Sequence, residues 1–149
     1  FQLAFTNEKN EDEQPVMIHV AVMGSTERFM GVLIEHYAGN FPVWLSPVQV
    51  VLLPVSDTFN EAAQQLAAKW KQLGVRVEVD TNAETLGNKI RKASALKVPY
   101  QIAFGQKEAD GADLQIRVRG QEKQTMMKTD AFEASLQKII SQRLIDLSL

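Results

Sequence analysis

Hydrophobic and polar positions in the second half of the chain follow strand and helix periods in turn. Apolar residues are nearly continuous over 50–55, as expected of a central strand covered on both faces. They alternate with polar residues over 75–79 and 114–118, the period-2 pattern of a strand with one wetter face. Residues 99–104 predict a strand that begins at a proline, and 125–128 predict a short edge strand.

Between these strands the apolar residues recur three or four positions apart, which predicts helices. Thr58 and Glu61 form a capping-box pattern before a helix that Gly74 ends. Thr81 and Glu84 form a second one, before a helix that runs to about residue 96, and a last helix begins at Asp130. Residues 105–111 are expected to be a polar turn.

This alternation of strands and helices implies right-handed crossovers and helices on both faces of a sheet. For residues 46–149 we therefore predict an α/β, three-layer domain, in which helices flank a mixed, mostly parallel five-stranded sheet.

Residues 1–45 show a different pattern of predicted elements. Segments 2–5 and 15–22 predict a hairpin around an acidic turn, and Met23-Gly24-Ser25 leads into a helix over 26–37. That turn is expected to bring Ser25 and Arg28 to one end of a sheet. Pro42 and Pro47 hold the following segment extended, so we place the domain boundary near Leu45.

Composition and charge narrow the function classes. A hydrophobic content of 45% fits a globular protein, and the absence of cysteine excludes disulfides and thiolate metal sites made by this chain alone. No membrane-length apolar run or signal peptide is visible, so we expect a cytoplasmic protein without a membrane partner. Residues 46–149 include fourteen basic and twelve acidic residues, so this part of the chain is only weakly positive. If it binds RNA, it must use a local patch and specific contacts rather than overall charge, and no DNA partner is expected.

The string GSTERF, preceded by MIH and followed by YAGNFPVWLSPVQV, carries a family resemblance. It is similar to the third class-defining motif of class II aminoacyl-tRNA synthetases, and its flanks resemble the threonyl-tRNA synthetase family. The resemblance covers nearly the whole chain. It implies a C-terminal fragment in which residues 1–45 are a strand-turn-helix remnant of the antiparallel-sheet catalytic domain and 46–149 are the anticodon-binding domain.

Three residues of the first domain have roles that the resemblance implies. His19 matches a zinc ligand, with the other two ligands expected outside this chain. Arg28 matches the arginine that stacks on the adenine of ATP, and Ser25 matches a residue at the substrate end of the site. From the residues alone, a histidine bonded within a sheet and a helix cap beside a surface ion pair remain alternatives.

Four residues of the second domain match anticodon contacts in the family: Arg91, Lys97, Glu108 and Arg117. Arginine can stack on an unpaired base or chelate a guanine edge, and glutamate can accept from base amino groups. The alternative for each is a solvated surface charge.

The resemblance thus implies a threonine–tRNA ligase as parent, using ATP with Mg, zinc, threonine and tRNA, and forming a homodimer, whereas this fragment alone is expected to be inactive. Two departures matter: Val20 stands where the family has arginine, and Ala83 where it has asparagine. They favour the alternative of a non-catalytic paralogue that binds RNA or a protein partner.

Overall fold

The computed structural model describes residues 3–149. The chain divides into two compact units, of which the first ends at Leu33 and the second covers Ile34–Leu149. The second unit contains a five-stranded sheet in the order β4-β3-β5-β6-β7. Its strands are β3 (Val50–Pro54), β4 (Val77–Val79), β5 (Tyr100–Phe104), β6 (Leu114–Val118) and β7 (Thr125–Met127).

The sheet is mixed, as the sequence predicts. Strand β3 lies parallel to both of its neighbours, with Val50 opposite Val77 on β4 and opposite Tyr100 on β5. Strands β5, β6 and β7 are successively antiparallel. All five residues of β3 are buried, which agrees with its nearly continuous apolar sequence.

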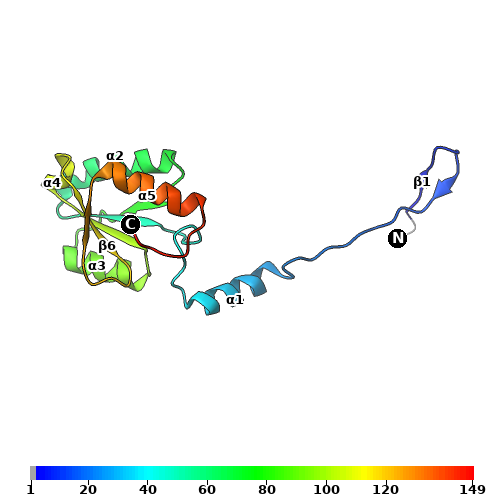
Figure 1. The fold of residues 1–149 in the computed structure, drawn as a ribbon, viewed down its shortest axis with the longest axis horizontal. Coiled ribbons are helices and arrows are strands. Elements are labelled where there is room, and N and C mark those ends of the chain that lie inside the picture. The colour runs from blue at the N-terminus through cyan, green and yellow to red at the C-terminus, as the bar shows by residue number, and fades with distance from the viewer. Residues whose placement is uncertain (1–2) are drawn as a thin grey trace. The chain divides into compact units, whose positions relative to one another are not determined.

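Helices cover both faces of this sheet and confirm the three-layer prediction (Figure 1). Helices α2 (Asn60–Gln72) and α5 (Thr129–Ser141) pack on one face, over the larger apolar cluster. The fully buried rings of Trp70, Tyr100 and Phe132 lie in this cluster, with ring centroids 5.5 and 5.6 Å from Phe132. Burial of such large side chains is the main source of stability for the unit.

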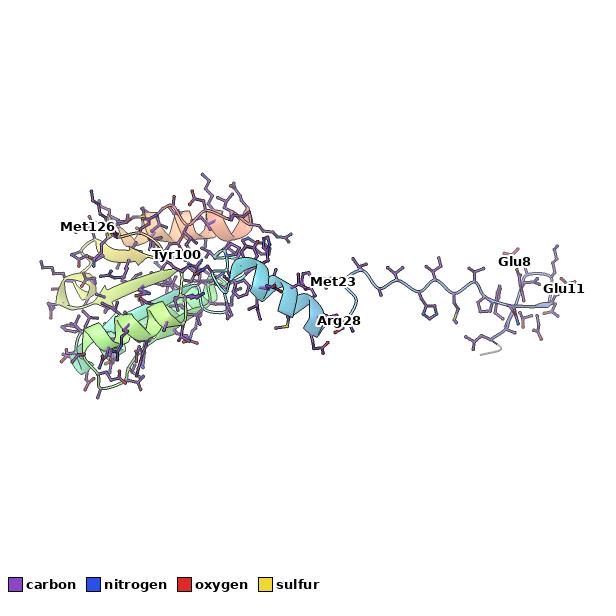
Figure 2. The ribbon with its side chains drawn as sticks, turned by 90° about the horizontal axis from the view of Figure 1, so that it is seen from below. Glu8, Glu11, Met23, Arg28, Tyr100 and Met126 are labelled. Carbon is purple, nitrogen blue, oxygen red and sulfur yellow. The ribbon has the colours of Figure 1, made fainter. Side chains whose placement is uncertain are left out.

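Helix α3 (Leu86–Ala95) covers only part of the other face. It packs on β3 and β5, over a smaller cluster that includes Val51, Leu53 and Ala93. Further along the same face, Gln115 of β6 and Met126 of β7 are exposed, and Figure 2 labels Met126 on this outer strand. One sheet face is therefore left partly open beside α3.

The starts of two helices differ from the sequence prediction. Thr58 lies inside a 3-10 turn, η1 (Asp57–Phe59), and no side chain caps η1 or α2. Helix α3 begins after Thr85, whose Oγ1 accepts from the backbone N–H of Asn88 at 3.4 Å, and not after Thr81. Both predicted capping boxes are therefore wrong: the pattern has the required residues, but competing turns place the first helical residue elsewhere.

The predicted polar turn at 105–111 contains a short helix, α4 (Gln106–Ala109).

The end that the sequence predicts for α2, at Gly74, is confirmed. Gly74 has φ +80°, and its N–H donates to the carbonyl of Lys71 while that of Val75 donates to Trp70. This left-handed residue closes the helix at low cost because glycine has no Cβ.

The first unit forms less structure than the sequence predicts. A hairpin of β1 (Phe5–Thr6) and β2 (Asp12–Glu13) encloses the acidic turn, but residues 15–22 form no strand. The predicted partner segment begins at Gln2, which lies outside the described residues. Within 15–22 the apolar side chains are exposed, up to 91% at Val16 and 89% at Val22. A strand needs neighbours for its backbone hydrogen bonds, and none of the strands in residues 3–149 pairs with this segment.

Helix α1 (Thr26–Tyr37) confirms the predicted helix, and the segment of the second unit that follows it is held by side-chain hydrogen bonds. Arg76 donates to the carbonyls of Ser46 (2.9 Å) and Trp44 (2.8 Å). Arg119 donates to that of Phe41 at 2.6 Å, and the ammonium of Lys97 donates to that of Ala38. Cationic side chains therefore fix the backbone of this segment, which includes the predicted boundary near Leu45.

Candidate nucleic-acid interface

Three chain segments meet at the carboxyl edge of the parallel strands. They are residues 55–57 after β3, residues 80–85 after β4, and residues 105–108 after β5, which include the start of α4. They meet because β4 and β5 flank β3 and are reached through helices on opposite faces. Open α/β sheets bind ligands outside the carboxyl ends of strands at such a switch of direction. A cleft of about 400 Å³ lies here, lined by residues 55–57, 82–85 and Lys89.

Lys89 holds this edge together from inside. Its side chain is only 2% exposed, and its ammonium donates to the carbonyls of Pro54 (3.1 Å) and Asp80 (2.9 Å). One residue of α3 therefore ties the ends of β3 and β4 to the helix. Charge-assisted hydrogen bonds of this kind are stronger than neutral ones, so Lys89 holds the start of the 80–85 loop against α3.

The partly open sheet face lies beside α3, with polar residues near the amino end of β5. Gln101 of β5 and Arg117 of β6 are register partners, so their side chains project side by side from the same face. The amide nitrogen of Gln101 donates to the hydroxyl of Ser94 on α3 at 3.1 Å. Arg91 precedes Ser94 by three positions and lies on the same side of the helix. The structure thus brings Arg91 and Arg117 to the two sides of one surface.

The charges at this surface differ in how they are held. Arg91 is exposed and Arg117 is half-buried. Within the described residues neither guanidinium has a hydrogen bond or an ion pair to a protein group. A guanidinium carries five donors, so both arginines keep their full donor capacity for a ligand. Lys92, by contrast, is paired with Glu84.

Glu108 lies at the carboxyl edge, in α4. Its Oε2 accepts from the backbone N–H of Gly105 at 3.0 Å, as the second partner of a capping box does. One carboxylate oxygen is therefore used to start α4, and the other is not bonded within the described residues. Glu108 can accept from a ligand only through that second oxygen.

Unlike Arg91 and Arg117, Lys97 uses its side chain within the protein. It follows the C-terminus of α3 in a left-handed conformation with φ +57°. Its ammonium donates to Ala38, and its carbonyl accepts from Arg119 at 2.5 Å. In this structure Lys97 fixes the segment after α1, and the predicted base contact at Lys97 stays a prediction.

Ser25 and Arg28, the predicted site residues at the start of α1, are exposed. The hydroxyl of Ser25 donates to Glu27 at 2.7 Å and accepts from the N–H of Arg28 at 3.3 Å, so Ser25 caps α1. The hydrogen bond from the Ser25 hydroxyl lowers the pKa of the Glu27 carboxyl group. Arg28 is exposed and lies at the start of α1 (Figure 2). The expectation that the turn brings Ser25 and Arg28 to a sheet end is wrong, because residues 15–22 before the turn form no strand.

His19 is exposed in the extended segment. Within residues 3–149 no three His, Cys, Asp or Glu side chains gather as metal ligands. Structural and catalytic zinc sites use at least three protein ligands, so the residues described here do not fit a zinc ion by themselves. Nor does any helix in this part of the chain have the length and apolar character to span a membrane.

Sequence reasoning missed three residues of the interface: Lys89, Ser94 and Gln101. The available signal was Gln101, a polar residue in the otherwise apolar strand YQIAF. It is 4% exposed, and its Oε1 has no hydrogen-bond partner within the described residues. An unsatisfied buried acceptor costs about 1–3 kcal/mol, so such an atom calls for an explanation.

Together these features define an α/β domain with two uncommitted arginines at a partly open sheet face and a cleft at the carboxyl ends of its parallel strands. Residues 49–139 match the family model described as the anticodon binding domain, and the chain belongs to this family. A solved structure supports this assignment. The RNA binding domain of threonyl-tRNA synthetase from Cryptosporidium parvum Iowa II has a TM-score of 0.74 and 29% identity, and the match covers 91% of this chain and 35% of that one.

The chain is also similar in sequence to curated threonine–tRNA ligases. It is 45% identical to the ligase of Clostridioides difficile (strain 630) over 143 residues, which cover 96% of the chain and 22% of that protein. It is 49% identical to the ligase of Finegoldia magna over 119 residues, which cover 80% and 19%. The chain therefore spans about a fifth of the length of these relatives. A prolyl-tRNA synthetase from Cryptosporidium parvum shares the fold, with a TM-score of 0.65 at 19% identity.

Proposed function

We propose that this chain binds the anticodon of threonine tRNA, as part of a protein that joins threonine to that tRNA. The carrying observation is the pair of uncommitted arginines, Arg91 and Arg117, at the two sides of the open sheet face. Membership of the anticodon binding domain family and 45% identity to a threonine–tRNA ligase support the proposal.

The chemistry of the surface suits unpaired bases. A planar guanidinium can stack on a splayed base or donate two parallel hydrogen bonds to a guanine edge. The free oxygen of Glu108 can accept from a base amino group. We assign Arg91, Arg117 and Glu108 to base contacts and propose that Lys97 contributes positive charge toward the phosphate backbone.

The proposed parent is a homodimeric, cytoplasmic, ATP-dependent class II threonine–tRNA ligase. In it Arg28 would contact the adenine of ATP, bound with Mg, and Ser25 would lie at the threonine end of the site. Because His19 is at most one ligand, any zinc site would need further residues from outside this chain, and we derive no step through the metal. The chain alone is expected to form no threonyl-adenylate, so pyrophosphate exchange by the purified 149-residue chain would refute this part.

The test is binding of the chain to a threonine anticodon stem-loop and to stem-loops altered at the second or third anticodon base. Two salt concentrations separate base recognition from phosphate binding, which weakens steeply with salt. We expect a preference of about tenfold, or about 1.4 kcal/mol, for the threonine loop. Arg117→Ala should abolish the preference, whereas Lys138→Ala, which removes an exposed charge from α5 on the opposite face, should retain it.

Equal binding to all stem-loops, or no binding, would overturn this proposal. It would favour the non-catalytic alternative, in which the domain serves as an interaction module. Ala83 lies in the cleft at the strand ends, in the position where the family has asparagine, and is the structural feature that favours that alternative.

A further inference from the structure

The unpartnered oxygen of Gln101 identifies a residue with no role in the proposed function so far. Its amide is buried between α3 and β6, and the nitrogen end is fixed by Ser94 at 3.1 Å. The oxygen end has no partner within the described residues. A buried acceptor in that state needs a donor nearby, and the nitrogen's bond to Ser94 leaves the oxygen as the end that is free to meet one.

The pairing of β5 with β6 identifies Arg117 as the neighbouring donor. Arg117 is the cross-strand partner of Gln101, so the two side chains leave adjacent backbone positions on the same face. Arg117 is half-buried, and its guanidinium has no protein partner within the described residues. Directly opposite residues of an antiparallel pair have Cβ atoms about 4.5–5.5 Å apart, a separation that the long side chain of Arg117 can bridge. Within residues 3–149 no acidic side chain is paired with Arg117 to compete for it.

We propose that Gln101 is a positioning residue for Arg117. Its Oε1 accepts one N–H of the guanidinium, while Ser94 fixes the other end of the amide. A guanidinium keeps four further donors, so the edge facing away from Gln101 can still contact a base. Holding the guanidinium plane reduces the rotamer freedom lost on binding, which turns a flexible arginine into a reader of base edges. This inference rests on the proposed function, because it takes Arg117 as a base contact.

The first measurement does not involve RNA. In the full 149-residue chain, nitrogen-15 NMR follows the exchange and rotation of the Arg117 side-chain N–H groups. Gln101→Met, which keeps the side-chain length and removes the acceptor, should speed them about fivefold. Gln101→Glu, which keeps an oxygen acceptor, should leave them slow. Gln137→Met, the same change on α5 on the opposite face, should have no effect. Equal Arg117 dynamics in the wild-type chain and Gln101→Met would overturn the proposal.

The second measurement is binding of the stem-loops described above. Gln101→Met should reduce the base preference about fivefold with an unchanged salt dependence, because no phosphate contact is lost. In an Arg117→Ala background, where the base preference is already lost, Gln101→Met should not lower the affinity for the threonine stem-loop any further, whereas a purely structural role would lower that affinity in both backgrounds. A further loss of affinity in the Arg117→Ala background would overturn the proposal. If the wild-type chain shows no base preference, the proposed function fails, and the NMR comparison alone decides whether Gln101 positions Arg117.

Discussion

At the scale of single residues, Tyr100 couples the core to the C-terminal tail. Its ring is fully buried, and its hydroxyl donates to the carbonyl of Leu147 at 3.0 Å. Burial, followed by the charge of Asp146, raises the pKa of Tyr100 well above the ordinary value. The buried hydroxyl therefore stays protonated where an unfolded tyrosine, with a pKa of about 10, ionises.

This pKa difference predicts an alkaline loss of stability. The folded pKa is raised, so Tyr100 stabilises the fold fully below about pH 10 and progressively less above it. Wild-type stability should fall by up to about 1.4 kcal/mol per pH unit more steeply than that of Tyr100→Phe. Urea unfolding at pH 8 to 11 measures both slopes. Parallel slopes for the two proteins would contradict the prediction.

Two arginines of the second unit should differ in what they contribute to stability. Arg119 donates to the carbonyls of Phe41 and Lys97, and burial lowers its pKa, although the group stays charged. We expect Arg119→Met to lower the free energy of unfolding by about 1.5–3 kcal/mol, because two charged hydrogen bonds are lost and Phe41 keeps only its bond from the Ser46 hydroxyl. Arg91→Met, at an exposed arginine without a protein partner within the described residues, is the matched control and should cost less than about 0.5 kcal/mol. Urea denaturation compares the two, and equal losses would contradict the assignment.

At the scale of elements, the start of α3 decides where Arg91 and Ser94 lie. Thr85 caps this helix, and Lys89 ties it to the ends of β3 and β4. Together they orient Arg91 and Ser94, which lie further along the helix. The element thus carries both the predicted contact at Arg91 and the support of Gln101.

The two candidate caps of α3 can be separated by mutation. Thr85→Ala should cost about 0.5–2 kcal/mol in unfolding free energy, because a backbone N–H loses its side-chain acceptor. Thr81→Ala, at the exposed position that the sequence pattern indicates as the cap, should cost less than about 0.5 kcal/mol. Thermal or urea unfolding measures both. A larger loss for Thr81→Ala would return the cap to the capping-box position.

At the scale of the whole molecule, the apolar core belongs to the second unit. Among the buried hydrophobic residues the first in sequence is Val43, whereas α1 has no buried residue. The first unit instead exposes apolar side chains such as Ile18 and Val20, at 84% and 74%. The stability of the chain therefore resides in residues after α1.

Removal of residues 1–33 should accordingly leave the unfolding midpoint of the remaining chain unchanged, with a free-energy difference below about 0.5 kcal/mol. The fluorescence of buried Trp70 during urea unfolding reports on the core. Limited proteolysis of the intact chain should first cut within 15–25, where the backbone is exposed. A clear drop in midpoint after the truncation would show that the first unit contributes to the core.

Much of the fold and part of the site followed from the sequence. The buried strand β3, the strands β5 and β6, the edge strand β7 and the helices between them are encoded by local periodicity, which each segment carries within itself. The contacts predicted at Arg91, Arg117 and Glu108 come from the resemblance of the chain to a family over nearly its whole length, and they stay predictions. The outcome for 15–22 differs, because a strand pattern forms a strand only beside another strand.

Only the tertiary structure decided how the chemistry is assembled. Thr85 caps α3 in place of Thr81, and Lys97 binds the segment after α1, because contacts between distant parts of the chain override local patterns. The placement of Gln101 against Ser94 and opposite Arg117 joins three elements and has no local signature. The sequence by itself determined most of the strands and helices of the second unit and the family to which predicted site residues could be matched. The packing of α3 on the sheet determined which of those side chains share a surface and which atoms remain free to bind.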